Sequence, residues 1–194
     1  RLIVNSAFCM IDKKSKDPKF VFLNLANAIK ANGFKDMDII IWAKGDEDFI
    51  KNHNYSNRWG SWMSASRPVI RSDSEIIMIF AKNSIKKLRK GESTITKEDF
   101  KKYTKNIWYI RNYSNPVHPA TYPVKLVVNL INLYTYKDDV ILDPFVGIGT
   151  TLMGCIETGR KCIGIELCED YYKEAIKNVS NFNVDLFNQN STIR

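Results

Sequence analysis

The segment Leu142 to Thr151, LDPFVGIGTT, decides the fold of this 194-residue chain. An apolar run of strand length leads into it, and a run with helical spacing begins at Thr150 and stops at Gly159. Gly147 and Gly149 allow the backbone to turn sharply and to approach a ligand closely. The N–H groups of the following helix turn would face that ligand. The segment therefore predicts a strand, a tight glycine turn and a helix.

The glycine spacing matches neither of two common nucleotide-binding loops. A Walker loop ends in Gly-Lys-Ser/Thr, and a complete G-x-G-x-x-G would need glycine in place of Leu152. A plain tight turn is therefore an alternative. Glu166 ends the next apolar run, IGIE, where an acid accepts hydrogen bonds from two ribose hydroxyls. This acid favours a nucleoside-containing cofactor, although Glu166 could instead cap the next helix or face water.

Apolar runs alternate with stretches of helical spacing along the rest of the chain. We expect strands at residues 1–8, 36–44, 75–82, 139–145 and 161–167, and helices at residues 20–31, 122–136, 150–158 and 169–179. The run DMDIIIWAK, residues 36–44, suggests a strand buried on both faces. A Lys-rich stretch from Asn83 to Asn112 shows little periodicity. The alternation predicts an α/β fold with a parallel, doubly wound sheet.

The composition suits a basic protein that binds a polyanion. Lysine and arginine number 29 against 21 aspartates and glutamates, a net charge of +8, although solvated surface lysines would give the same balance. The four cysteines lack C-x-x-C spacing, so we expect buried free thiols and no metal site. No apolar run is long enough to span a bilayer, and we expect a cytoplasmic protein.

Three segments, in a fixed order, resemble motifs of one family. DPFVGIGTT, residues 143–151, is similar to the D-P-F-x-G-x-G-T-T cofactor motif of the DNA amino-methyltransferases, which methylate an exocyclic amine of cytosine or adenine with S-adenosyl-L-methionine. HPATYP, residues 118–123, resembles their H-P-A-x-F/Y-P segment beside the methionine end of the cofactor. WGSWMSASRPVIRSDSEIIMIFAK, residues 59–82, is similar to a segment seen most often in enzymes that modify cytosine N4.

The resemblance implies a Rossmann-like, doubly wound and mostly parallel sheet with one antiparallel strand. It makes residues 1–194 a single, partial methyltransferase domain. The cofactor-binding residues that it implies are His118, Pro119, Ala120, Asp143, Phe145, Gly147, Gly149, Thr150 and Glu166. Ile165 and Leu167 are candidates for contacts near the adenine. Phe145 could instead be a core residue, and the two prolines could simply set where the next helix begins.

A double-stranded DNA substrate requires basic and aromatic residues, because a base must leave the stack before its amine can react. We expect DNA contacts from Arg58, Ser61, Trp62, Ser64, Arg67 and Arg71. Residues 83–112 add a basic segment with aromatic residues, and we expect this segment to be the target-recognition insert.

The catalytic residues are not identified, because the family's D/S-P-P-Y/F motif is missing. No two prolines are adjacent in this sequence. In the family's permuted order that motif precedes the first strand, and Arg1 lies within an apolar run. We therefore expect a central strand to be missing between the strands at residues 1–8 and 139–145. A missing N-terminal part or a second chain would then carry the catalytic motif, and a homodimer is a further expectation.

The sequence therefore predicts a DNA methyltransferase that acts on cytosine N4, within a restriction-modification system. Adenine N6 is the close alternative, because the same pocket serves both amines. A second alternative is a non-catalytic subunit of a split enzyme that binds DNA or the cofactor. A methyltransferase of RNA or small molecules could share the fold, but the segment at residues 59–82 argues against it.

Overall fold

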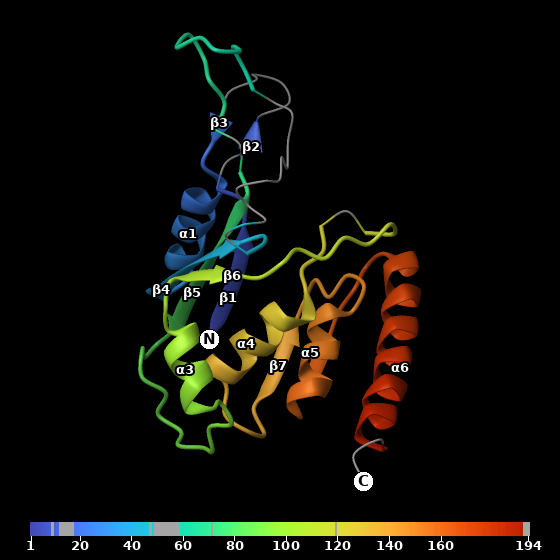
Figure 1. Cartoon of the computed structure of the whole chain (residues 1–194). Helices are drawn as coiled ribbons and strands as arrows, with labels where there is room; N and C mark the ends of the chain where they lie inside the picture. Colours follow the sequence, from blue (N-terminus) through green and yellow to red (C-terminus); the bar gives the residue numbers. More distant parts are fainter. Residues whose placement is uncertain are drawn as a thin grey trace. The chain divides into compact units, whose positions relative to one another are not determined.

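The chain divides into two compact units. The computed structural model describes residues 1–8, 10–11, 18–46, 48, 59–70, 72–118 and 120–191. Unit 1 comprises residues 1–89 and 104–111, and unit 2 comprises residues 90–103 and 112–194. Unit 1 carries most of the strands and unit 2 most of the helices (Figure 1).

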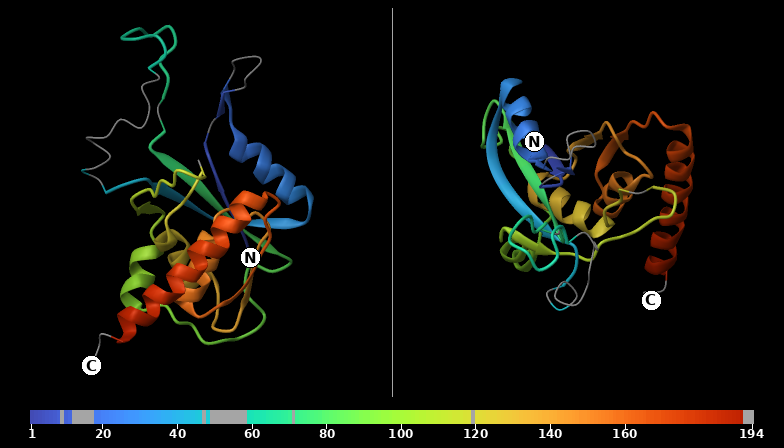
Figure 2. Two further views of the ribbon diagram at one scale, coloured as in Figure 1. Left: turned by 90° about the vertical axis from the view of Figure 1, so that its right-hand side faces the viewer. Right: turned by 90° about the horizontal axis from the view of Figure 1, so that it is seen from above.

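Four strands form the main sheet of unit 1, in the order β1-β5-β4-β6. They are β1 (Leu2–Ser6), β4 (Phe34–Ala43), β5 (Ser74–Lys82) and β6 (Ile107–Tyr109). β5 pairs antiparallel with both β1 and β4, whereas β6 pairs parallel with β4. Figure 2 shows β4 and β5 side by side. β1, β4 and β6 therefore point the same way, and β5 alone runs against them.

The core of unit 1 is built on β5, which is apolar on both faces. Ile76, Met78 and Phe80 face helix α1 (Val21–Ala31) and are at most 3% exposed. Phe22, Leu25, Ala26 and Ile29 of that helix pack against them. The alternate residues Ile77 and Ile79 are also buried. The helical spacing of apolar residues in α1 thus places one apolar stripe on one face of the sheet.

β4 is buried only in its second half, so the prediction of a strand buried on both faces was partly wrong. Ile40, Trp42 and Ala43 are buried, whereas Ile39 is 54% exposed. The burial of a strand face depends on what packs against it: Ile41 of β4 packs against the core of β5. β6 lies alongside β4 only from Ile41 to Ala43. Among the described residues, the first half of β4 therefore lies at the edge of the sheet.

Two short elements were not predicted from the Lys-rich segment at residues 83–112. They are α3 (Lys97–Tyr103) in unit 2 and β6 in unit 1. β6 has three residues, which is too few for a periodic pattern to emerge. Trp108 in its centre is 2% exposed, so burial rather than length fixes this strand. A further two-stranded ladder, β2 (Met10–Ile11) with β3 (Pro18–Lys19), also lies in unit 1.

Unit 2 contains a strand-helix-strand unit that matches the predicted order. β7 (Val140–Asp143) and β8 (Lys161–Gly164) pair in parallel, and α5 (Thr150–Thr158) connects them. Ile141 of β7 and Cys162 of β8 pack against the core residues of α5 and of α4 (Val124–Tyr134). α4 and α5 approach closely at Gly154, where an added Cβ would lie 2.7 Å from Cγ1 of Val127. Gly154 therefore sets the packing distance between these two helices.

The second half of unit 2 ends in a long helix, α6 (Glu169–Ser191). The helix extends beyond the predicted end at Val179.

Before α6, the buried Arg160 connects several segments of unit 2 by hydrogen bonds. It donates to Thr135 Oγ1, to Thr94 Oγ1 and to the carbonyl oxygen of Thr158. Arg160 is 6% exposed.

The cysteines were predicted as buried free thiols. Cys155, Cys162 and Cys168 are all free, and Cys155 is buried. Cys168 is exposed, so the predicted burial was wrong there, because this residue lies in the loop before α6 rather than in an element. Cys9 lies outside the described residues. Within the part of the chain that the structure describes, no helix is long and apolar enough to cross a membrane.

Candidate functional site

The quoted segment forms a turn that is fixed by the carboxylate of Asp143, the last residue of β7. Its Oδ1 accepts the N–H of Phe145 at 3.0 Å, and its Oδ2 accepts the hydroxyl of Thr151 at 2.5 Å. Because the Thr151 hydroxyl donates its proton to Asp143, Thr151 Oγ1 accepts the hydroxyl proton of Tyr122 at 3.0 Å. This hydrogen-bonded chain joins the start of α4, the start of α5 and the end of β7.

Tyr122 keeps its proton over the whole physiological pH range. Burial raises the pKa of its phenol to about 12, and the negative charge of Asp143 adds to the effect. The hydroxyl of Tyr122 therefore remains a hydrogen-bond donor to Thr151. Neither Tyr122 nor Thr151 was among the predicted site residues, although both lie in the quoted motifs, at the aromatic position of HPATYP and the last threonine of DPFVGIGTT.

Gly147 and Gly149 both require glycine for their backbone conformation. Their φ angles are +55° and +91°, in the left-handed region. An added Cβ at Gly149 would also lie 3.3 Å from the backbone of Ala175 in α6. At Gly147 the nearest atom to an added Cβ is His118 Nε2, at 3.6 Å. Gly149 is therefore restricted by conformation and by space, and Gly147 mainly by conformation.

Glu166 lies beside the glycine turn. Its Oε2 accepts the N–H of Gly147 and its Oε1 accepts the N–H of Cys168, each at 2.9 Å. The pKa of the Glu166 carboxyl is lowered, chiefly by the Cys168 N–H and further by the Gly147 N–H. The carboxylate is thus ionised at neutral pH, and each of its oxygens retains a lone pair that can accept another hydrogen bond.

His118 approaches the same turn from the segment before α4. Its Nδ1 accepts the N–H of Ala120 at 3.1 Å, so the neutral ring carries its proton on Nε2, the nitrogen nearer Gly147. The ring meets Tyr171 of α6 edge to face, with 4.5 Å between centroids. His118 is therefore held as a donor next to the turn. Pro119 lies outside the described residues.

Apolar side chains surround the turn without being buried. Phe145 is 86% exposed, Ile165 is 54% exposed and Leu167 is 100% exposed. The alternative interpretation of Phe145 as a core residue was therefore wrong. Thr150, in contrast, lies at the start of α5 and is 5% exposed. The structure thus brings together all the described residues predicted for the cofactor, within unit 2.

A second candidate site lies in unit 1, in the loop at residues 59–69. Ser61 N–H donates to the carbonyl of Arg67 at 2.9 Å, and Val69 N–H donates to the carbonyl of Trp59 at 3.1 Å. Gly60 closes this ladder with φ +70°, and an added Cβ there would clash with the Arg67 carbonyl oxygen. Glycine at position 60 is therefore required for the loop to close.

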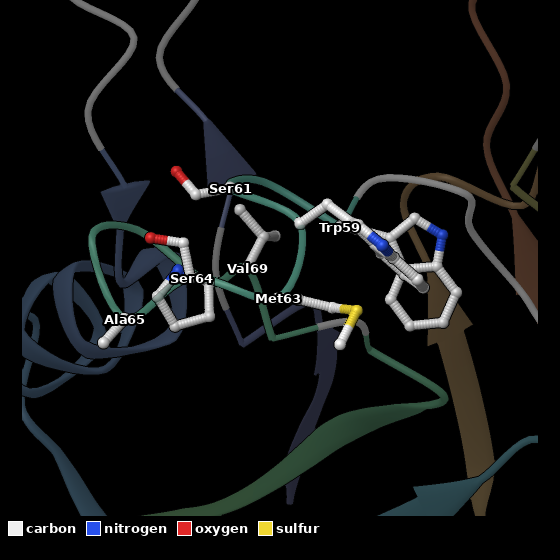
Figure 3. Close-up of a pocket in the computed structure, with 8 residues that line it drawn as sticks. Trp59, Ser61, Met63, Ser64, Ala65 and Val69 are labelled. Atoms are coloured by element: carbon white, nitrogen blue, oxygen red, sulfur yellow. The ribbon is translucent and has the colours of Figure 1, made fainter.

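The loop encloses an open hollow of about 370 Å³, which we name the tryptophan pocket (Figure 3). Trp59 and Trp62 line it together with Met63, Ser61, Ser64 and Val69. The rings of Trp59 and Trp62 meet at 84°, with 5.0 Å between centroids. Three of the residues predicted to contact DNA, Ser61, Trp62 and Ser64, thus line one pocket.

The other predicted DNA contacts are more scattered. Arg67 belongs to the same loop and is exposed, but it does not line the pocket. Arg58 and Arg71 lie outside the described residues. Among the described residues, no group of three or more histidines, cysteines, aspartates or glutamates is placed to hold a metal ion.

Comparison with known proteins identifies the family. A family described as DNA methylase, whose members act on N6 or N4 amines, matches residues 4–177. The chain belongs to the DNA amino-methyltransferases. The family resemblance seen in the three sequence motifs is therefore confirmed, whereas the choice between the N4 and N6 amines is not resolved by this match.

Type II methyltransferases are among the related DNA methylases. M.BglI of Bacillus subtilis is 31% identical over 172 residues, which cover 88% of this chain and 46% of that protein. M.MthZI of Methanothermobacter thermautotrophicus is 29% identical over 172 residues, covering 81% of this chain and 46% of that protein. The chain thus spans about half the length of these relatives.

Solved DNA methylase structures share the fold. A modification methylase from Thermus thermophilus, TTHA0409, complexed with S-adenosyl-L-methionine, has a TM-score of 0.70 at 23% identity and covers 93% of this chain and 68% of its own. The cytosine-N4-specific PvuII DNA methyltransferase has a TM-score of 0.62 at 18% identity, with 96% of this chain and 69% of its own covered. The predicted α/β class is confirmed by these likenesses.

Proposed function

We propose that the protein is a site-specific DNA methyltransferase that transfers a methyl group from S-adenosyl-L-methionine to N4 of cytosine. The observation that carries the proposal is the contact between Glu166 and Gly147, which brings an ionised carboxylate to a glycine turn after a strand. The related type II methyltransferases support a role in a restriction-modification system. A DNA substrate also fits the expected cytoplasmic location.

The residues of the turn suit S-adenosyl-L-methionine. The second lone pairs of the Glu166 carboxylate would accept hydrogen bonds from the ribose hydroxyls. Ile165 and Leu167 offer exposed apolar surface for the adenine, and Phe145 offers an exposed ring. The Nε2 proton of His118 would donate toward the methionine end of the cofactor.

The bound cofactor would supply an activated methyl group on a positively charged sulfur. The contribution of this chain is positional: the turn would hold the donor, and residues of unit 1 would contact the DNA. As the new carbon–nitrogen bond formed, the carbon–sulfur bond would break, S-adenosyl-L-homocysteine would leave and the amine would lose a proton. The D/S-P-P-Y/F motif of the family would accept hydrogen bonds from that amine. That motif does not occur in the 194 residues.

We propose that a polypeptide segment outside this sequence supplies that motif, either from the same protein or from a second chain. β1 pairs only with β5, and β7 only with β8, among the described strands. Each therefore has one edge that a further strand can join. In the main sheet, β5 runs antiparallel to its neighbours β1 and β4. This direction supports the proposed Rossmann-like, mostly parallel sheet, in which one central strand would be missing from this sequence. We also propose a homodimer, although a second copy of these 194 residues would not supply the motif.

The substrate is double-stranded DNA in this proposal, and residues 83–112 form the target-recognition insert. These residues include nine lysines and arginines against three acidic residues. Arg58, Arg67 and Arg71 would neutralise phosphates, and Ser61, Trp62 and Ser64 would lie near the target base.

The identity of the methylated amine is tested by the product. The protein, together with the segment or second chain that carries the D/S-P-P-Y/F motif, is incubated with DNA and isotopically labelled S-adenosyl-L-methionine. The DNA is then digested, and the labelled nucleoside is identified by mass spectrometry. N4-methyl-2′-deoxycytidine supports the proposal, and N6-methyl-2′-deoxyadenosine supports the adenine alternative. No labelled nucleoside, with the cofactor bound in a calorimetric titration, indicates a non-catalytic subunit.

A further inference from the structure

We infer that helix α6 positions the cofactor site through two side chains, Asn178 for the glycine turn and Tyr171 for His118. Neither of the two residues was predicted from the sequence, and neither would itself touch the cofactor. This role rests on the proposed function and names the residues outside the turn that give the site its binding geometry.

One face of α6 meets the site along two turns of the helix. Tyr171, Ala175 and Asn178 have the spacing i, i+4 and i+7, so they share one face. Each contacts a different part of the site: the segment before α4, the end of the glycine turn, or its middle. In contrast, Tyr172 and Ile176 of the same helix are about half exposed.

Asn178 fixes the orientation of the peptide group between Ile148 and Gly149. Its Nδ2 donates to the carbonyl oxygen of Ile148 at 3.0 Å. On the other side of the same planar group, the N–H of Gly149 donates to the carbonyl oxygen of Val146 at 3.0 Å. Both polar groups of this peptide are therefore held, one by α6 and one by the turn itself.

This hydrogen bond is needed because glycine leaves the backbone of the turn free to adopt other conformations. Gly147 and Gly149 flank Ile148, and both have positive φ angles, which glycine adopts about as readily as negative ones. The local sequence thus permits the turn without selecting it. The bond from Asn178 selects one orientation, and a preformed turn loses less conformational freedom when a ligand binds.

Ala175 allows α6 to approach the turn this closely. It is 2% exposed, and an added Cβ on Gly149 would lie 3.3 Å from its Cα, its Cβ and its carbonyl oxygen. The helix and the turn therefore meet at two small residues. A larger side chain at either position would push Asn178 away from Ile148.

Tyr171 restricts the ring of His118, which lies in neither a helix nor a strand. The two ring centroids are 4.5 Å apart and the planes meet at 61°, an edge-to-face contact. The imidazole Nδ1 also accepts the N–H of Ala120. These two contacts orient Nε2, the nitrogen proposed to donate toward the methionine end of the cofactor.

The test compares two ligands, S-adenosyl-L-methionine and adenosine, which share the nucleoside and differ in the methionine end. Calorimetric titration of the 194-residue chain gives both affinities. Tyr171→Ala should weaken the binding of S-adenosyl-L-methionine by about 3- to 10-fold, as for loss of one aromatic pair, and leave adenosine binding unchanged. Tyr171→Phe keeps the ring and should bind both ligands like the wild type. Tyr172→Ala is the matched control, because Tyr172 is the 53% exposed neighbour.

A double variant shows whether Tyr171 acts through His118. Once His118 is replaced by alanine, adding Tyr171→Ala should not weaken the binding of S-adenosyl-L-methionine further. A further loss of the same size as in the single variant would contradict the positioning role of Tyr171.

Asn178→Ala should weaken the binding of both ligands by the same factor, about 3- to 10-fold, because the turn lies beside the part that they share. Asn178→Asp keeps the size of the side chain but lacks the amide donor, and it serves the same comparison if Asn178→Ala does not fold. Asn181→Ala is the matched control, because Asn181 is exposed on the same helix.

Two kinds of outcome would overturn the inference in distinguishable ways. Unchanged affinities of the Asn178 variants, or no selective loss in Tyr171→Ala, would remove the positioning roles and leave the cofactor site in place. If the wild-type chain binds neither ligand, the cofactor site assigned to the turn is wrong, and both roles are wrong with it.

Discussion

At the scale of single residues, the turn after β7 depends on a few side chains whose partners are specific. Asp143 accepts one backbone and one side-chain proton, and Glu166 accepts two backbone protons. Both carboxylates thus shape the loop before any ligand binds.

Replacing Gly149 by alanine should lower both stability and cofactor affinity. A left-handed conformation costs alanine about 1–2 kcal/mol, and the new Cβ would press on Ala175 at 3.3 Å. Gly33→Ala is the matched control, since Gly33 has φ +81° and no atom within 4 Å of an added Cβ. Thermal unfolding should show a loss for both variants, and calorimetry with S-adenosyl-L-methionine a loss for Gly149→Ala alone. Equal cofactor affinity would show that the turn does not approach the cofactor.

Replacing Glu166 by glutamine should weaken cofactor binding about tenfold or more, because a charged acceptor of hydrogen bonds is lost. The lowered pKa of Glu166 gives the effect a pH dependence. Its stabilisation of the loop is present above the usual glutamate pKa and is lost as the pH falls through the lower pKa of the folded state. Wild type should therefore lose affinity at acidic pH more steeply than the variant.

The control for this experiment is Glu169→Gln on α6. Glu169 is 78% exposed and forms an ion pair with Lys173 on the same helix. Its replacement should leave cofactor affinity unchanged. If the Glu166 and Glu169 variants bind the cofactor alike, the ribose role of Glu166 is wrong.

Replacing Thr151 by valine should destabilise the protein by about 1–3 kcal/mol, because Tyr122 loses its acceptor and Asp143 loses a donor in a buried place. Tyr122→Phe removes only the first bond and should cost less. Urea unfolding of both single variants and the double variant forms a double-mutant cycle. Strict additivity of the two losses would mean that the hydrogen-bonded chain is not a unit.

At the scale of elements, the sequence predicted most helices and strands, because their apolar spacing is regular. α5 begins and ends where the pattern predicts, between the glycines that flank it at positions 149 and 159. β6 could not be predicted, because three residues carry no period and their burial depends on β4, more than sixty residues earlier. The half-exposed β4 could not be predicted either, because the burial of a strand face depends on the side chains that pack against it.

The candidate cofactor site likewise contains residues that the sequence predicted and residues that it could not predict. The residues of the glycine turn follow from local spacing and from family resemblance. The role of Tyr122 could not be inferred from the sequence, because its partner Thr151 is reached only after α4 packs on α5. The tryptophan pocket likewise depends on the closure of a loop at Gly60, a property of the backbone.

A prediction at this scale concerns the contact between α4 and α5. Gly154→Ala gains helix propensity of about 1 kcal/mol, but the new Cβ would lie 2.7 Å from Val127, which is 7% exposed. Overpacking costs about 1–3 kcal/mol, so we expect a net loss in free energy of unfolding. Combining Gly154→Ala with Val127→Ala should restore the packing distance. A double variant less stable than the sum of both single losses would contradict this account.

At the scale of the whole molecule, charge should govern DNA binding. Lys97 and Lys101 are exposed and lie one turn apart on α3, within the proposed recognition insert. If both contact phosphates, replacing them by glutamine should reduce the slope of log affinity against log salt by about 2. Lys173 and Lys177 of α6 have the same spacing and form the matched control. Equal slopes for the two double variants would place the DNA elsewhere.

The path of the chain has a consequence for the biosynthesis and the proteolysis of the protein. The chain passes from unit 1 to unit 2 at residue 90, returns at residue 104 and leaves again at residue 112. β6 is therefore synthesised after α3, and unit 1 cannot complete its sheet on the ribosome until part of unit 2 has been made. No single peptide-bond cleavage can release either unit, so a protease nick between residues 90 and 103 should leave both fragments associated.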